Sequence, residues 1–152
     1  MKLFIALLTF MVSSIGYANC TITNNYDHEL RRVVYDNNGW DIESEKYNKI
    51  CNRLKAANLG VEFTQMAMIS QSASVASTNI VFFPIEIKDK YGKRVLTSTG
   101  YSSMFTDEIR TTTALDAVRY ASANRVLLNI IGDENSWKEI LDQAAFIRKY
   151  IK

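Results

Sequence analysis

The sequence has little of what most enzymes use for catalysis. Its 152 residues include one histidine, His28, and two cysteines, Cys20 and Cys51. No G-x-S-x-G, Walker or H-E-x-x-H motif occurs. A zinc site needs several histidine or cysteine ligands, and a disulfide would use both cysteines. The sequence therefore predicts no catalytic residue set, no metal site and no cofactor.

An excess of charge of one sign is also missing. Lysine and arginine together number 18 and aspartate and glutamate 16, so the formal net charge is +2. No block of five like charges occurs, which argues against a nucleic acid or a polyanionic partner. One proline and six glycines argue against a flexible linker or a disordered tail.

Long apolar runs are absent except at the start of the chain. Lys2 precedes an apolar stretch at residues 3–12, and the small residues Gly16 and Ala18 follow it. This order is typical of a secretory signal peptide that is cut between Ala18 and Asn19. The stretch is also too short for the roughly 20 apolar residues that span a bilayer.

We therefore expect a signal peptide over residues 1–18 and a soluble, single exported domain over residues 19–152, with no stable membrane insertion after cleavage. Cys20 does not fit a lipid anchor well, because Asn19 stands where a small residue should precede the cysteine. Two cysteines in an exported chain favour one disulfide, Cys20–Cys51, with two free thiols as the alternative.

Hydrophobic periodicity predicts most of the secondary structure. Residues 24–39 are ambiguous, and the pattern slightly favours an extended segment over a helix. The expected elements are a helix at 41–58, strands at 61–69, 79–88 and 93–103 with a hairpin turn at 89–92, and helices at 107–131 and from 136 onward. The expected N-caps are Asp41, Thr106 and Ser136, the last with Glu139 at capping-box spacing.

Segregated strands and helices predict the α+β class. The expected architecture is a small single domain in which a helix is followed by a three-stranded antiparallel meander. Two C-terminal helices then pack on one face of the sheet.

Two residues raise a functional question. His28 could take part in acid–base chemistry, but its polar surroundings at residues 26–29 are more typical of a solvated turn. The polar loop at 36–41 lacks the sixth-position glycine of a calcium-binding loop. Trp40 in this loop is expected to cover the core. The alternative is an exposed contact for a partner, since interface hot spots are enriched in tryptophan.

These features favour a non-enzymatic protein-binding module, such as an assembly accessory, a secretion adaptor, or an inhibitor or immunity protein. The expected location is the periplasm, with secretion as the alternative, and the expected partner is another envelope or secreted protein. The other hypotheses are a carrier of a small apolar ligand and a small hydrolase that uses carboxylates.

Overall fold

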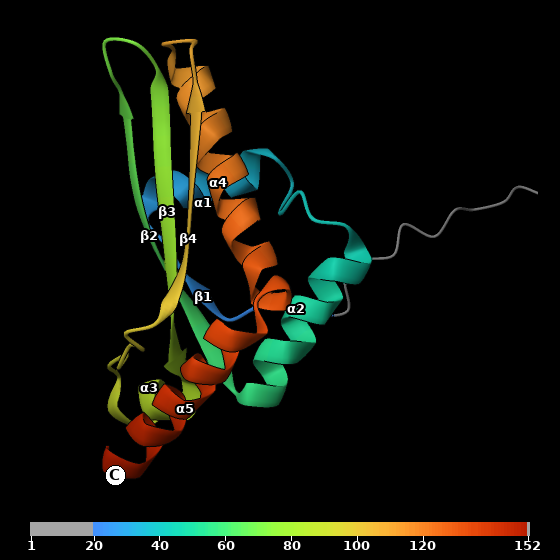
Figure 1. Cartoon of the computed structure of the whole chain (residues 1–152), viewed down its shortest axis with the longest axis vertical. Coiled ribbons are helices and arrows are strands. Elements are labelled where there is room, and N and C mark those ends of the chain that lie inside the picture. The colour runs from blue at the N-terminus through green and yellow to red at the C-terminus, as the bar shows by residue number, and fades with distance from the viewer. Residues whose placement is uncertain (1–19, 152) are drawn as a thin grey trace, which may run out of the picture.

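A computed structural model describes residues 20–151 as a small α+β domain (Figure 1). The expected signal peptide and its cleavage site, Ala18–Asn19, lie outside the described residues. The elements in chain order are β1 (Asn24–Asn25), α1 (His28–Asp36), α2 (Ser44–Ala57), β2 (Leu59–Ile69), β3 (Ser74–Pro84), α3 (Ile85–Tyr91), β4 (Gly100–Asp107), α4 (Thr112–Gly132) and α5 (Glu134–Tyr150).

The sheet has the strand order β1-β2-β3-β4. Strands β2, β3 and β4 form the expected antiparallel meander. The sequence analysis missed β1, a two-residue strand that pairs parallel to β2 at Val61 and Glu62. The β2–β3 pairing is continuous from Leu59–Pro84 to Ile69–Ser74, so these two strands form one long hairpin.

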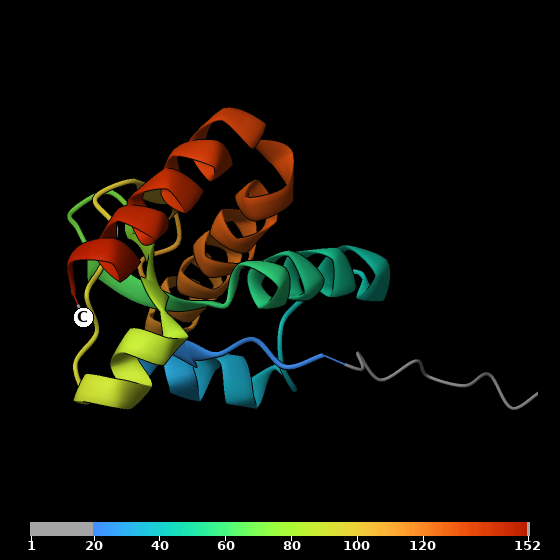
Figure 2. The ribbon, with the colours of Figure 1, turned by 90° about the horizontal axis from the view of Figure 1, so that it is seen from below.

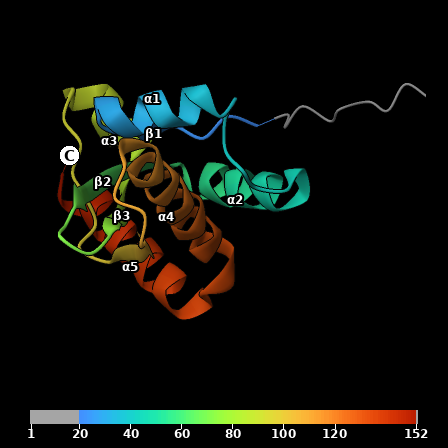
Figure 3. The same ribbon diagram turned by 90° about the horizontal axis from the view of Figure 1, so that it is seen from above.

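Helices α4 and α5 pack against the sheet as expected, with α4 against β3 and β4 and α5 against β3. Viewed along the long axis, α5 and the C-terminal part of α4 lie on one side of the molecule, and α1 and α3 lie on the other (Figures 2 and 3). At the centre of the core, the Phe82 ring makes edge contacts with Tyr101 at 6.0 Å and Trp137 at 5.7 Å. None of the helices in residues 20–151 is long and apolar enough to cross a membrane.

The preference for an extended segment over residues 24–39 was wrong, because most of this segment is helix α1. The Asp27 side chain caps the helix by accepting a hydrogen bond from the Leu30 N–H at 2.8 Å. Leu30, Val33 and Val34 then fall on one buried face. A helix so short shows too few turns for its periodicity to outweigh the β-branched residues at its centre.

The expected strand at 79–88 and hairpin turn at 89–92 were also partly wrong. Strand β3 ends at Pro84, which cannot donate to a strand ladder, and helix α3 follows it directly. Gly92, in the left-handed conformation with φ 67°, ends α3. Residues 93–99 then run as an irregular segment, so the third strand of the meander begins at Gly100 instead of residue 93.

The three predicted N-caps are replaced by neighbouring residues. Helix α2 starts at Ser44 with Glu43, not Asp41, as its N-cap, and the Asp41 N–H instead donates to the Asn124 side chain at 3.0 Å. Thr111, not Thr106, caps α4. Asp133, not Ser136, caps α5, and Ser136 N–H donates to its carboxylate at 3.1 Å.

The hairpin contains one close approach that requires glycine. Gly60 lies opposite Phe83 in the β2–β3 register. A Cβ atom on Gly60 would lie 2.3 Å from the Phe83 ring, far inside contact distance. The Phe83 ring therefore rests directly on the backbone of β2.

Candidate functional site

The structure gives His28 no catalytic surroundings. The His28 side chain is 87% exposed, and its Nδ1 lies 3.8 Å from the Glu29 carboxylate. Across residues 20–151, no group of three or more His, Cys, Asp or Glu side chains is placed to hold a metal ion. His28 is thus a solvated residue at the start of α1.

Cys20 and Cys51 form a disulfide whose Cα atoms are 6.0 Å apart, within the usual range. Cys51 is fully buried on the inner face of α2, and Cys20 is also buried. The bridge fastens the start of the described chain to α2, just ahead of β1.

Trp40 packs on the core while part of its ring remains accessible. Its ring stacks on Phe63 at a centroid distance of 5.5 Å and an interplanar angle of 13°, and meets the edge of Tyr26 at 6.2 Å. The left-handed residues Asn38 (φ 58°) and Gly39 (φ 111°) reverse the chain just before it. The structure therefore places Trp40 against the sheet, in the position expected of a core lid.

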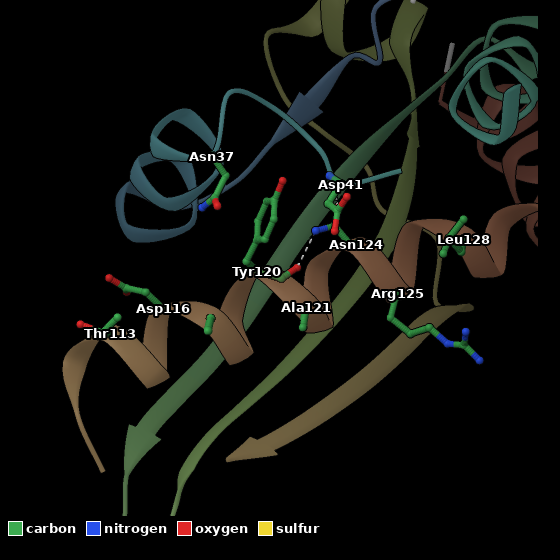
Figure 4. Close-up of a pocket in the computed structure, with 10 residues that line it drawn as sticks. Asn37, Asp41, Thr113, Asp116, Tyr120, Ala121, Asn124, Arg125 and Leu128 are labelled. Carbon is green, nitrogen blue, oxygen red and sulfur yellow. Dashed lines mark hydrogen bonds between the residues drawn. The ribbon is translucent and has the colours of Figure 1, made fainter. Parts of the chain in front are cut away.

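A pocket of about 510 Å³ lies between the 37–41 loop and α4 (Figure 4). The polar groups beside it mostly hold the loop in place. The Tyr120 hydroxyl donates to the Gly39 carbonyl at 2.6 Å, and Asn124 accepts from the Asp41 N–H. Burial raises the pKa of Tyr120, which keeps this hydroxyl a donor. Asp116 is bound by Arg32 at 2.9 Å, so its carboxylate is already paired.

In the half of the sheet nearest the 70–73 turn, one face is exposed. Met66 and Met104 flank Ser77 in one cross-strand row, and Met68 lies beside Val75 in the next. The three methionines are 75% (Met66), 62% (Met68) and 67% (Met104) exposed. We call Met66, Met68 and Met104 the methionine face.

The opposite face of the same strands is covered by α4. There Thr78 and Ser122 share a hydrogen bond of 2.6 Å, and the Gln65 amide donates to Thr78 at 2.8 Å. The Thr78 and Ser122 hydroxyls and the Gln65 amide nitrogen satisfy one another, whereas the Gln65 Oε1 atom has no partner among the described residues. The described residues therefore cover the α4 side of these strands and leave the methionine face exposed.

Strand β2 also has an unpaired edge. The Val61 N–H donates to Thr23 at 2.9 Å, so Val61 directs its backbone away from β3 and towards β1. Backbone groups alternate along a strand, so Gln65, Ala67 and Ile69 point the same way. Because β1 is only two residues long, no described segment pairs with these three residues. We call the outward N–H and C=O groups of Gln65, Ala67 and Ile69 the free edge.

A pocket of about 530 Å³ lies along the free edge. Its walls combine residues of β2, such as Ala67 and Met68, with Asp27 and Glu29 at the start of α1 and with Arg119 of α4. A hydrogen bond from Arg32 lowers the pKa of Glu29, so this carboxylate stays charged at neutral pH. The pocket therefore offers backbone hydrogen-bonding groups, an apolar wall and carboxylates side by side.

Sequence reasoning identified neither the methionine face nor the free edge. Met66 and Met68 alternate with smaller residues in β2, a pattern that could have indicated an exposed apolar stripe. The free edge had no such signal, because it exists only through the shortness of β1. No family model, curated protein or solved structure matches the chain.

Proposed function

We propose that the protein is an exported, non-enzymatic protein-binding module whose partner covers the methionine face. The observation that carries this proposal is the exposure of three methionines on a sheet face that described residues leave bare. Methionine is flexible and polarizable, and it is enriched at surfaces that adapt to protein partners. Exposed apolar patches on small proteins commonly mark interaction sites.

The proposed setting is the periplasm, where the partner would be another envelope or secreted protein. The disulfide supports an oxidising compartment. The amino-terminal pattern at residues 1–18 supports export. Intact mass of the exported protein tests this: a chain that begins at Asn19 and lacks two hydrogens is expected, whereas a retained amino terminus or a mass with diacylglycerol would contradict it.

The binding proposal is tested by partner capture from envelope extract with the tagged, oxidised protein. The variant Met66→Glu/Met104→Glu places two charges on the methionine face and should reduce recovery of a stoichiometric partner at least tenfold. Tyr35→Ser, at an 82% exposed position on α1, is the matched control and should leave recovery unchanged. Equal recovery with both variants, or no stoichiometric partner for the wild type, contradicts the proposal.

A carrier of a small apolar ligand is the second candidate function. The pocket along the free edge supports it, because Met66, Met68 and Val75 line about 530 Å³ of space. Native mass spectrometry of protein purified from envelopes would then show a stoichiometric small-molecule adduct. Met68→Glu should remove that adduct, and its absence from the wild type would reject the carrier.

A further inference from the structure

We infer that the free edge of β2 binds an extended segment of a partner protein as an added strand, with apolar side chains alternating with lysine or arginine. This inference rests on the proposed function and names how the partner is held. Its first basis is the backbone of Gln65, Ala67 and Ile69, whose outward N–H and C=O groups lack a strand partner among residues 20–151. An exposed sheet edge is a template for another extended chain.

The added segment would continue an existing row of hydrogen bonds. Strand β1 already occupies this edge at Val61 and Glu62 and then leaves it, because the chain turns into α1 at His28. The end of the hairpin extends beyond α1 in Figure 1, so α1 leaves that end of the edge uncovered, while Asp27 and Glu29 at the start of α1 line the pocket beside Gln65 and Ala67. A guest strand takes the position that β1 vacates and adds to the same sheet.

The two sides of the guest strand meet different surfaces. Successive side chains of a strand point to opposite faces, so one set lies beside Met66 and Met68 on the methionine face. The other set lies over Gln65 and Ala67, beside Asp27 and Glu29, in a pocket that Met66 and Met68 also line. The first set is therefore apolar, because it extends an apolar surface.

Charge selects the second set of side chains. Two carboxylates, Asp27 and Glu29, and one guanidinium, that of Arg119, line the pocket, and Arg32 pairs with Glu29 at 3.2 Å from outside the lining. Among the described residues, the Gln65 Oε1 atom accepts no hydrogen bond, and the Arg119 Nε atom of the same pocket donates none. Lysine or arginine side chains on the guest complement the net negative charge of the residues that line the pocket.

The same carboxylates argue against a second copy of this chain as the occupant. A two-fold pairing of two β2 edges about Ala67 would bring Asp27 and Glu29 of both copies to one short stretch of edge. Like charges in such a position oppose self-pairing, which is how many proteins protect an exposed edge strand. The occupant is therefore a different polypeptide with basic residues at alternate positions.

The test uses the oxidised, exported protein and a synthetic heptapeptide of alternating lysine and valine, acetylated and amidated at its ends. Binding is followed by NMR and by amide hydrogen exchange. The amides of Gln65, Ala67 and Ile69 should become at least tenfold more protected, whereas the inward amides of Met66 and Met68 should change little. The same peptide with glutamate in place of lysine should bind at least tenfold more weakly.

Ala67→Pro removes an outward N–H without removing a ladder bond, and it should reduce peptide affinity at least tenfold. Ala67→Thr keeps the N–H and is the matched control. If Ala67→Pro does not fold, the double variant Asp27→Asn/Glu29→Gln replaces it. Asparagine still caps α1, so this variant should fold. It should bind the lysine peptide tenfold more weakly than the wild type.

Several results would overturn the inference. They are no binding of the lysine peptide at millimolar concentration, protection spread outside the free edge, or equal affinity of Ala67→Pro and the wild type. A dimer that Ala67→Pro converts to a monomer would assign the edge to a second copy instead. If Met66→Glu/Met104→Glu loses the envelope partner while Ala67→Pro retains it, the strand-addition inference fails and the proposed function stands.

Discussion

Trp40→Ala offers the most direct test of how the 36–41 loop is held. The variant removes the stack on Phe63 at 5.5 Å and the edge contact with Tyr26 at 6.2 Å. Truncation of a buried tryptophan costs about 3–5 kcal/mol. Because Trp40 is partly buried, we expect a value near the lower end, about 3 kcal/mol, of which roughly 1 kcal/mol belongs to the aromatic pair.

Thermal unfolding of the oxidised protein measures this loss. For a domain of this size, about 3 kcal/mol corresponds to a decrease in Tm of about 10 °C. Trp40→Phe keeps an aromatic ring on Phe63 and should recover about half of the loss. Tyr35→Ala, on the exposed side of α1, is the control and should change stability by less than about 0.5 kcal/mol.

A Tm for Trp40→Ala within about 1 °C of the wild type would refute the interpretation of Trp40 as a core lid. If this variant also lost partner capture, the 36–41 loop would become the binding site. Trp40 would then be the exposed anchor that the sequence analysis gave as the alternative.

Three further predictions concern stability. Reduction, or Cys20→Ala, should lower the free energy of unfolding by about 3 kcal/mol; matching urea midpoints under oxidising and reducing conditions would contradict a structural disulfide. Gly100→Ala should lower the free energy of unfolding by about 2 kcal/mol or more, because the added Cβ would overlap the Ile80 carbonyl. Gly132→Ala is the control: it has open space around it and should leave stability unchanged or raise it by up to about 1 kcal/mol. Burial raises the pKa of Tyr101 from its usual value of 10.0 to about 12. The contribution of Tyr101 to the free energy of unfolding is therefore complete below pH 10 and is lost as the pH rises towards 12. Tyr101→Phe should therefore lose less stability than the wild type over that interval, and parallel pH profiles of the two proteins would show that Tyr101 does not titrate as described.

The long elements could be predicted because burial imposes a clear period on them. Helices α2 and α5 each repeat that period several times, so their existence was clear even where their ends were not. Helix α3 was missed because alternating Ile85 and Ile87 fit a strand equally well over so short a segment. The packing of the folded chain, and not the local sequence pattern, determines that residues 85–91 form a helix.

The candidate site was harder to predict, because it is defined by what is missing around it. The free edge depends on β1 ending at Asn25, and the sequence of β1 has no hydrophobic pattern that would mark it as a strand. The methionine face depends on α4 covering the opposite side of the sheet. Neither condition is local to β2, so neither could be deduced from the residues of β2 themselves.

The contact between Phe83 and Gly60 has a consequence for the other end of the hairpin. Near the 70–73 turn, β2 and β3 pair through small and polar residues such as Ala67, Ala76 and Thr78, which specify strand alignment only weakly. A slip of two residues would bring Phe83 opposite Asn58 or Glu62, whose Cβ atoms would occupy the space of the ring. Gly60 therefore fixes the strand alignment from a position about 33 Å from the turn, and it keeps a weakly specified pair of strands in one register that a binding partner can recognise.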